Sequence, residues 1–248
     1  MLFFFSLPKT DTFLLTTLNV QTNYNKSRES ICVEKTKPGL LIVFEGIDGT
    51  GKTTQAKLLK FKLEGLGLQV ELFKEPTDQT IEGQKLRASY SSGRVSLEQE
   101  LDWFMRDRAW NVRERVLPAL KRGAIVLLDR YFFSTACYQG ARKNNDWKSI
   151  LALNRREFPE PDLTIIFDLE PAIALQRIYS QRKKSNTFEG LEYLSQVRAL
   201  FLEIYHTDNI GKYLLLNANK GIYELASELF KAVLPLLEKR GMVGTNQQ

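Results

Sequence analysis

Apolar runs alternate with amphipathic stretches along the chain from residue 40 onward. Three of these runs are continuous over five residues, at Leu40–Phe44, Ala124–Leu128 and Leu163–Phe167. A continuous run of this length is typical of a parallel strand that is covered on both faces. Shorter runs at Gln69–Phe73 and Tyr213–Leu216 predict two further strands.

Stretches with helical spacing of apolar residues separate these strands. The predicted helices are Thr53–Leu66, Glu82–Ser89, Leu97–Lys121, Leu169–Ser180, Leu191–Tyr205 and Ile222–Lys239. The first ends in Gly-Leu-Gly, a typical helix stop, and Pro171 falls in the first turn of the fourth, where proline is tolerated. Because strands and helices alternate without internal repeats, the pattern predicts a three-layer α/β fold with a mainly parallel sheet between helices.

The same pattern indicates no domain boundary after residue 38, so we expect one domain over residues 39–240. Residues 1–38 are interpreted as an N-terminal extension, since their apolar segment LFFFSLP is short and is soon broken by polar residues. A loosely attached segment, an over-assigned start and an organellar targeting segment remain open as explanations. The tail GMVGTNQQ, residues 241–248, is expected to fray.

Composition narrows the possible functions. The chain has 248 residues, of which 43% are hydrophobic and 26% charged, and a formal net charge of +6. A basic chain favours acidic partners, which include phosphorylated small molecules as well as nucleic acids. Cys32 and Cys137 lack the spacing of a zinc site or a disulfide framework and fit a reducing compartment, and the single histidine, His206, disfavours a serine-type triad. No apolar run is long enough for a membrane span.

The segment GIDGTGKT, between the first strand and the first helix, matches the pattern G-x-x-x-x-G-K-[ST]. Its glycines allow successive backbone N–H groups to wrap a phosphate, and the helix N-terminus adds further N–H groups. Lys52 is then placed to reach the β- and γ-phosphates of ATP, and the Thr53 hydroxyl to bind Mg²⁺. A chance glycine-rich turn is the alternative. The expected nucleotide-binding residues are Gly46, Ile47, Asp48, Gly49, Thr50, Gly51, Lys52, Thr53 and Thr54.

Two features favour phosphoryl transfer over hydrolysis. The chain has no late N-K-x-D motif, which GTP-selective switches use to read guanine. Motor-like ATPases place a water-activating acidic residue after the Asp that ends the second continuous apolar strand, whereas here Arg130 follows Asp129. An arginine cannot polarise water but can hold a second phosphate, so we expect transfer between two phosphorylated molecules.

Four ordered segments resemble the thymidylate kinase family, and the resemblance as a whole covers roughly residues 39–236. They are FEGIDGTGKTTQ, KEPTDQTIEGQKLR, FMRDR and DRYFFSTACYQG, the last with Cys137, which we expect to be a small packed residue, in place of the family's alanine. The resemblance implies a P-loop nucleoside-monophosphate kinase fold with a short mobile lid. It also implies transfer of the γ-phosphoryl group of Mg·ATP to dTMP in dTTP biosynthesis, by a cytoplasmic homodimer.

The chemistry of individual residues supports the resemblance independently. Phe104 and Arg108 lie four positions apart, so on a helix they share a face and are placed to stack on and hydrogen-bond one base. Alternatively, Phe104 belongs to the core and Arg108 is a surface partner of Asp107. Arg130 follows a strand end, where α/β sheets bind ligands, and its forked guanidinium suits a monophosphate, although a structural salt bridge is the alternative. Asp129 is expected to hold Mg²⁺ directly or through water.

Other roles follow from the resemblance alone. It implies that Asp48 binds the acceptor's 3′-hydroxyl or positions its phosphate, although an Asp here can also bond to its own loop. Tyr138 would crowd the sugar 2′ position and favour deoxyribose, and the Gln139 amide would bond to the thymine edge. Arg87 would bind the monophosphate, and fits a solvated helix position nearly as well. The expected acceptor-binding residues are Glu75, Pro76, Arg87, Phe104, Arg108, Arg130, Ser134, Thr135, Tyr138 and Gln139.

A basic stretch before the fifth predicted helix resembles the family's lid. Some members place an arginine inside the glycine loop, where this chain has Gly49, so the charge on the moving phosphoryl group must be stabilised from elsewhere. We expect Arg182 to do this, with Arg177 and the two lysines after Arg182 as reserves. The chain has Asn186-Thr187 where many bacterial members have Asp-Arg, and a solvated basic loop is the alternative. The expected catalytic residues are Asp48, Lys52, Arg130 and Arg182.

Two other functions remain as alternatives. A related kinase would phosphorylate another deoxynucleotide or an unphosphorylated nucleoside, but Arg130 favours a phosphorylated acceptor. A basic P-loop protein would bind nucleic acid and use nucleotide only as a switch, but the sequence has no basic stripe with interleaved aromatics beyond the lid. We therefore expect ATP and dTMP as partners, Mg²⁺ as cofactor, and neither nucleic acid nor a membrane.

Overall fold

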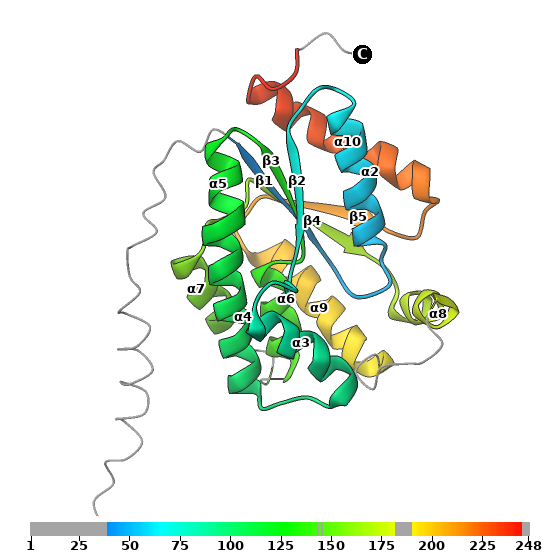
Figure 1. The fold of residues 1–248 in the computed structure, drawn as a ribbon. Coiled ribbons are helices and arrows are strands. Elements are labelled where there is room, and N and C mark those ends of the chain that lie inside the picture. Colours follow the sequence, from blue (N-terminus) through cyan, green and yellow to red (C-terminus); the bar gives the residue numbers. More distant parts are fainter. Residues whose placement is uncertain (1–38, 143, 145, 182–189, 245–248) are drawn as a thin grey trace, which may run out of the picture. The chain divides into compact units, whose positions relative to one another are not determined.

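Five parallel strands form the centre of the fold and lie in the order β2-β3-β1-β4-β5 (Figure 1). The computed structural model describes residues 39–142, 144, 146–181 and 190–244. The strands are β1 (Leu40–Glu45), β2 (Val70–Lys74), β3 (Ile125–Asp129), β4 (Leu163–Asp168) and β5 (Tyr213–Asn217). Each lies within one residue of a predicted run, and every neighbouring pair is parallel. The predicted α/β architecture is confirmed.

Burial explains why the strands differ in sequence. Every residue of β1 and β3 is buried, as expected for strands with neighbours on both sides and covered faces. β2 lies at an edge of the sheet, where Glu71 is half-buried and Lys74 is exposed. The continuous apolar runs therefore correspond to interior strands.

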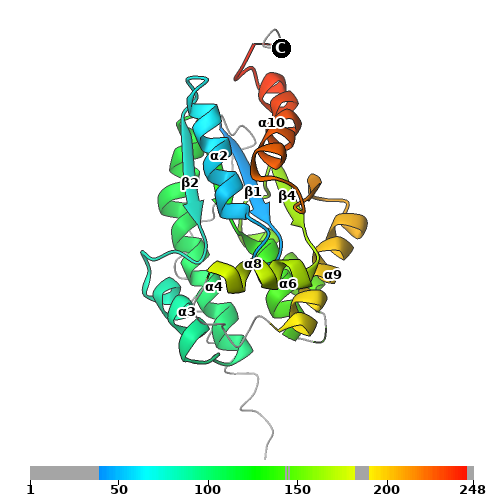
Figure 2. The same cartoon turned by 90° about the vertical axis from the view of Figure 1, so that its right-hand side faces the viewer.

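Helices cover both faces of the sheet. They are α2 (Lys52–Glu64), α3 (Ile81–Ser92), α4 (Leu97–Asn111), the π-helical segment η1 (Val112–Val116), α5 (Leu117–Lys121), α6 (Phe132–Arg142), α7 (Trp147–Glu157), α8 (Pro171–Gln181), α9 (Leu191–Thr207) and α10 (Ile222–Lys239). Figures 1 and 2 show α2 and α10 together on one face and the α4–α5 helix on the other. α6 packs against α4, α7 and α9. The sheet thus lies between two helical layers, as predicted.

α6 and α7 had no predicted counterpart. α6 is buried from Phe132 to Cys137 and again at Gln139 and Gly140. Its apolar and polar residues are nevertheless segregated as in an amphipathic helix, so the sequence contains a signal for α6. In α7 the buried residues Trp147, Ile150, Leu151 and Asn154 likewise follow helical spacing, a signal that the sequence does contain.

The long helix predicted at Leu97–Lys121 is present, but its winding changes midway. α4 continues through η1 into α5 without a break. Pro118 has no N–H to donate to the carbonyl four residues before it, and its ring presses against that carbonyl. The Leu117 N–H donates to the Val112 carbonyl, five residues back, which makes the wider π turn.

The carboxyl ends of the parallel strands meet at one edge of the sheet, where α/β folds bind ligands. Phe44 of β1 and Lys74 of β2 both pair in register with Asp129, the last residue of β3. Figure 2 shows α3 and α8 near this end of the sheet. The functional side chains are therefore sought here.

The described residues fall within one compact unit, Lys35–Gln248. The predicted extension at residues 1–38, the lid residues 182–189 and the tail residues 245–248 lie outside the described part of the chain. Among the helices that are described, none is long and apolar enough to cross a membrane.

Candidate active site

The chain between β1 and α2 forms a loop whose backbone leads directly into the helix. Gly51, at a φ of 89°, precedes α2, and no side chain in the described ranges caps the first turn of this helix. The N–H groups of that turn are therefore available to an anion. Lys52 is 5% exposed, and its Nζ donates to the carbonyl oxygens of Gly46 at 2.9 Å and Ile47 at 2.6 Å. The ammonium group thus lies against the same loop.

In the absence of a phosphate, the neighbouring carboxylates do not fully compensate the buried positive charge of Lys52. Burial and then the positive charge of Arg130 lower the pKa of Lys52 to about 7, although Asp48, Asp129 and Glu45 act in the opposite direction. An incoming phosphate would supply the missing charge and favour the protonated lysine. A buried lysine with a lowered pKa beside free helix N–H groups marks a site prepared for an anion.

Two of the loop's glycines are required for packing, because a side chain at either position would clash with neighbouring backbone. A Cβ on Gly46 would lie 2.5 Å from the carbonyl oxygen of Phe167, and a Cβ on Gly49 would lie 2.5 Å from that of Ala174. Gly49 also has a φ of 84°, which side chains rarely tolerate. The loop therefore packs directly against the end of β4 and against α8, which fixes the concave path of its backbone.

Thr53 and Asp129 form an oxygen-rich pair beside the loop. Thr53 Oγ1 donates to Asp129 Oδ2 at 2.5 Å, and Lys74 Nζ lies 3.4 Å from the same oxygen. Asp129 is 2% exposed, and its Oδ1 has no hydrogen-bond partner among the described residues. The described residues contain no cluster of three or more candidate ligands that would hold a metal alone. One carboxylate and one hydroxyl nevertheless suit Mg²⁺, which keeps water ligands and takes others from bound phosphates.

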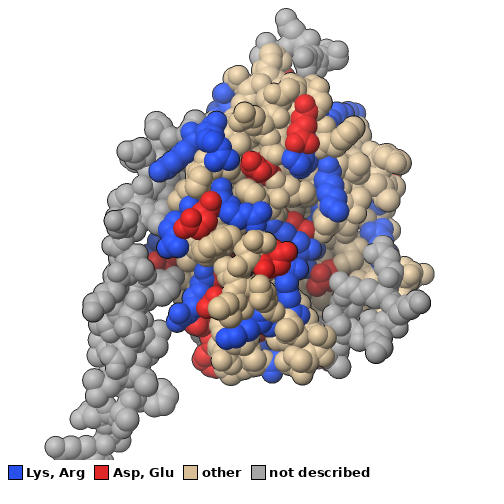
Figure 3. Space-filling model, viewed as in Figure 1, with Lys and Arg blue, Asp and Glu red and all other residues tan. Residues whose placement is uncertain are grey.

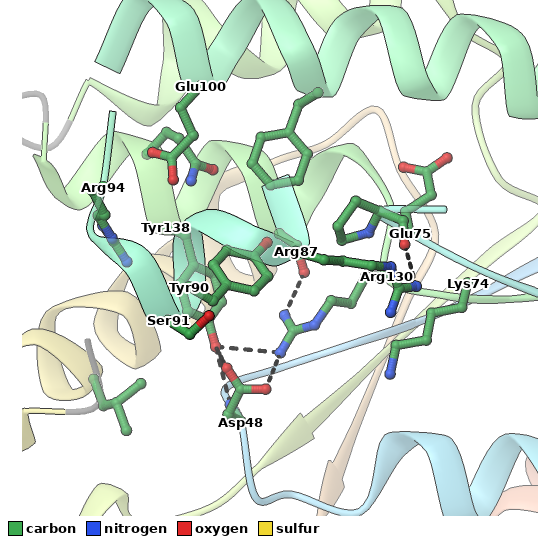
Figure 4. Close-up of a pocket in the computed structure, with 15 residues that line it drawn as sticks. Asp48, Lys74, Glu75, Arg87, Tyr90, Ser91, Arg94, Glu100, Arg130 and Tyr138 are labelled. Carbon is green, nitrogen blue, oxygen red and sulfur yellow. Dashed lines mark hydrogen bonds and ion pairs between the residues drawn. The ribbon is translucent and has the colours of Figure 1, made fainter. Parts of the chain in front are cut away.

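Arg130 joins the glycine loop to a neighbouring pocket. Its φ of 73° lies in the left-handed region, which a non-glycine residue adopts only when its surroundings hold it there. Its Nη2 donates to Asp48 Oδ1 at 2.7 Å and its Nη1 to Ser134 Oγ at 2.9 Å (Figure 4). The Tyr138 hydroxyl donates to the other Asp48 oxygen at 3.1 Å. These residues form one hydrogen-bonded network between loop and pocket.

Both members of the central ion pair are charged. Burial acts to raise the pKa of Asp48, but the charges of Arg130 and Lys52 outweigh it and hold that pKa well below its usual range. Burial likewise acts to lower the pKa of Arg130, and the Asp48 charge more than compensates. Arg130 and Asp48 therefore both stay ionised beside the neighbouring pocket.

A cavity of about 420 Å³ opens beside Arg130, a size typical of small-molecule sites. Most of the predicted acceptor residues line it, although they come from separate segments of the chain. Those that do are Glu75, Pro76, Arg87, Phe104, Arg130, Ser134, Tyr138 and Gln139, and Asp48 of the loop joins them. Arg87, which the sequence left between pocket and solvent, donates to the carbonyl oxygens of Pro76 at 2.5 Å and Thr77 at 3.2 Å.

Two predicted acceptor residues, Arg108 and Thr135, do not line this cavity. Arg108 is 1% exposed, and its guanidinium donates to Glu75 Oε2 and to Thr135 Oγ1, both at 2.8 Å. It is therefore not the surface partner of Asp107 that the sequence allowed; Asp107 instead accepts hydrogen bonds from Thr77. Arg108 stands behind the wall of the cavity and fixes Glu75.

Six further residues line the cavity without having been predicted. They are Lys74, Tyr90, Ser91, Arg94, Glu100 and Leu194. Only Lys74 lies within one of the four recognised segments, next to the Glu-Pro pair, so it alone carried a usable signal. The others come from α3, α4, α9 and the connection between α3 and α4, which pack around the cavity, and no short motif marks them.

Two buried oxygens of cavity-lining residues have no hydrogen-bond partner within the described ranges. They are Gln139 Oε1 and Glu100 Oε1. The other carboxylate oxygen of Glu100 accepts from Arg142, which compensates its charge. An unpartnered buried acceptor is costly, so an N–H group of a ligand or a water molecule is expected to satisfy each of them.

The predicted lid can be placed only in part. Arg177, a reserve for the catalytic cation, lies on α8 and donates to the Ala218 carbonyl oxygen at 3.1 Å. Arg182, the expected catalytic arginine, lies outside the described residues, as do Lys183 and Lys184.

Comparisons of the sequence with known proteins find one family. The family model described as "Thymidylate kinase" matches residues 44–229. A protein of Archaeoglobus fulgidus named "Probable thymidylate kinase" is 41% identical over 194 residues, which cover 78% of this chain and 94% of that protein. The thymidylate kinase of Xylella fastidiosa strain M12 is 44% identical over 166 residues, 67% of this chain and 75% of its own. That of Xanthomonas campestris pv. campestris strain B100 is 45% identical over 170 residues, 68% and 73% of the two chains.

Proposed function

The chain belongs to the thymidylate kinase family, and on that premise we propose that residues 46–54 bind ATP while the cavity beside Arg130 binds dTMP. The enzyme transfers the γ-phosphoryl group of ATP to dTMP and yields ADP and dTDP for dTTP biosynthesis. An oxygen of the dTMP phosphate bonds to the γ-phosphorus while the bond from that phosphorus to the β–γ bridging oxygen breaks. A kinase for another acceptor and a nucleotide-switched nucleic-acid binder are not favoured.

The donor half of the site consists of the loop backbone and Lys52. The free N–H groups at the start of α2 bind the phosphates, and Lys52 moves from the loop carbonyls onto the β- and γ-phosphate oxygens. Thr53 and Asp129 hold Mg²⁺, which neutralises phosphate charge when it is bound. Because Gly49 packs against α8 with no room for a side chain, the loop itself supplies no arginine, and Arg182 of the lid is assigned to the moving phosphoryl group.

One observation carries the acceptor half: Arg130 is hydrogen-bonded at 2.7 Å to Asp48 of the glycine loop. The cation that we assign to the dTMP phosphate is thereby fixed to the loop that we assign to ATP. Phosphoryl transfer depends mainly on holding donor and acceptor in line and on neutralising charge, so this short link is what the reaction requires.

The remaining cavity residues suit a deoxynucleoside. Phe104 offers an aromatic face for stacking on a base. Gln139 Oε1, which lacks a partner among the described residues, accepts from the N3–H of thymine. Tyr138 stands next to Asp48, where its ring limits space at the sugar 2′ position.

Among the described residues, the face of the molecule shown in Figure 3 has no continuous basic surface of the kind that binds nucleic acid. Figure 3 shows acidic side chains interspersed with the basic ones. Ion pairs such as Arg106–Asp102 and Arg113–Glu114 offset several of the arginines along α4 and η1. Small phosphorylated substrates account for the basic pocket without a long anionic ligand.

Two variants test the two halves separately. Lys52→Ala should lower kcat by about 100-fold or more while the protein stays folded, because it removes the main cation of the donor site. Arg130→Ala should raise the KM for dTMP by about tenfold or more and change the KM for ATP much less. Arg106→Ala, which removes an exposed arginine from α4, is the matched control and should leave both KM values unchanged. Full turnover of Lys52→Ala, or an unchanged KM for dTMP in Arg130→Ala, would contradict the assignment.

We further propose that the enzyme is a cytoplasmic homodimer, as the family resemblance implies. Cys137 is a buried free thiol, which fits a reducing compartment. Light scattering should give twice the mass of one chain. The mass of a single chain at micromolar concentration would contradict the dimer.

A further inference from the structure

Glu45 is a buried carboxylate that has no role in the mechanism described so far. It ends β1, directly before the glycine loop, and is 0% exposed. Its Oε1 accepts from the backbone N–H groups of Tyr131 at 2.9 Å and Ser134 at 3.1 Å. Its Oε2 accepts from the Ser134 hydroxyl at 2.5 Å. A buried carboxylate is retained at a cost, so its contacts call for an explanation.

The hydrogen bonds that Glu45 Oε1 accepts from backbone N–H groups fix the turn that carries Arg130. α6 starts at Phe132, and Glu45 accepts from N–H groups at this helix start, as a capping side chain would. The negative charge is also favourable at a helix N-terminus. Arg130 lies two residues before this start, and its left-handed backbone is held between the capped turn and a hydrogen bond from its N–H to the Phe44 carbonyl.

The hydrogen bond between Glu45 Oε2 and the Ser134 hydroxyl connects Glu45 to the Arg130 side chain. Ser134 Oγ donates to Glu45 and accepts from Arg130 Nη1 at 2.9 Å. A hydroxyl that donates to a carboxylate becomes a stronger acceptor, and its proton points away from the arginine. Glu45 thus acts on both the backbone and the guanidinium of the residue that we assign to the dTMP phosphate.

From these contacts we propose that Glu45 is a positioning residue for the acceptor phosphate, acting through Ser134 on Arg130. The proposal rests on the acceptor role of Arg130 given under the proposed function. Glu45 touches neither nucleotide; it aims the guanidinium into the cavity while Asp48 holds its other nitrogen. Its loss should therefore affect the use of dTMP more than the use of ATP.

Glu45→Gln and Ser134→Ala test this relay. The glutamine keeps the shape and one acceptor oxygen, but places an NH₂ donor opposite Ser134, so the serine proton loses its acceptor. The alanine leaves Glu45 in place as the backbone cap. It removes the hydroxyl that accepts from Arg130 Nη1 and donates to Glu45, while the bond from Arg130 to Asp48 stays. Each variant should raise the KM for dTMP by about tenfold, the usual effect of losing one hydrogen bond to a charged group, with little change in the KM for ATP. The double variant should be no worse than either single one, because both act through one contact.

Several outcomes would overturn the proposal. These are an unchanged KM for dTMP in a folded Glu45→Gln variant, an equal rise in both KM values, and additive effects in the double variant. If Glu45→Gln shows no cooperative thermal unfolding, Ser134→Ala decides: a raised KM for dTMP supports the relay and an unchanged one overturns it. If Arg130→Ala raises this KM but the other two variants do not, only the relay fails. If Arg130→Ala has no effect, the proposed acceptor site fails with it.

Discussion

Tyr138 stands at the junction of the donor and acceptor halves. Its hydroxyl accepts from the Asp48 N–H at 3.0 Å and donates to Asp48 Oδ2 at 3.1 Å. The Arg130 guanidinium lies 5.1 Å from the centre of its ring, a cation–π contact. The hydroxyl therefore anchors the ring to the glycine loop, and the ring limits the space beside the sugar.

We predict that Tyr138→Ala widens acceptor use from deoxyribose to ribose. Removing the ring frees the space that we assign to the 2′ position. The kcat/KM for 5-methyluridine 5′-monophosphate, relative to that for dTMP, should rise by about tenfold. Tyr138→Phe is the matched control, since it keeps the ring, and its ratio should stay near that of the wild type. The same ratio in the alanine and phenylalanine variants would contradict the role of the ring.

At the residue scale, the sequence predicted most of the side chains that belong to the site. It did not predict the hydrogen bonds that hold these side chains in position. Arg130 and Asp48 were predicted from separate motifs, and the structure brings them together. The bond between Arg108 and Glu75 joins residues 33 positions apart, and the bonds between Glu45 and Ser134 join residues 89 positions apart. Such contacts depend on how elements pack, and no short pattern encodes them.

Among the elements, α3 is tied to α4 at its first turn. Thr80 Oγ1 accepts from the Gly83 N–H at 2.8 Å as the N-cap, and donates to Asp107 Oδ1 on α4 at 2.5 Å. α3 carries the cavity residues Arg87 and Tyr90. One threonine thus stabilises the helix start and positions a wall of the acceptor cavity.

Thr80→Ala should lower the free energy of unfolding by about 1 to 2 kcal/mol, the usual cost of a lost N-cap. The KM for dTMP should rise as well, because the cavity wall loses its tie to α4. Ser96→Ala is the matched control: Ser96 caps α4 from an exposed position through one bond to the Gln99 N–H at 3.2 Å. Urea unfolding and steady-state kinetics measure both effects. A larger loss of stability in Ser96→Ala, or an unchanged KM in Thr80→Ala, would contradict this role.

At the scale of the whole molecule, the arrangement of the motifs follows from the parallel sheet. The glycine loop, the Glu-Pro segment and the Asp-Arg-Tyr segment each follow a strand, so their meeting at one edge was predictable from the strand assignment. Phe104 joins them from α4, and its distance from this edge depends on how that helix lies across the sheet. That part of the site required the structure.

Glu45 is one of several carboxyl groups that the fold buries, and its protonation should make the stability of the fold depend on pH. Burial raises the pKa of Glu45 from 4.5 to about 7, although the Ser134 hydrogen bond, Arg130 and the backbone N–H groups of Tyr131 and Ser134 act to lower it. Between these two values the native chain binds more protons than the unfolded chain. The stability that Glu45 contributes is therefore present below 4.5 and is lost as the pH rises to about 7.

Glu45→Gln should remove this dependence. The Tm of the wild type minus that of the variant should decrease as the pH rises from 4.5 to about 7, and level off above that range. Thermal unfolding of both proteins at closely spaced pH values measures it. A difference that stays constant or grows across this range would contradict the burial of an ionisable Glu45.

If ATP binds on the glycine loop and dTMP binds beside Arg130, the release of ADP must depend on the acceptor. The most direct measurement is a coupled ADP-release assay with dTMP, dUMP, dCMP, dGMP and UMP as acceptors. We predict the highest kcat/KM for dTMP and little ADP without an acceptor. A preference for dGMP, exclusive use of dUMP, or release that is independent of any acceptor would contradict it.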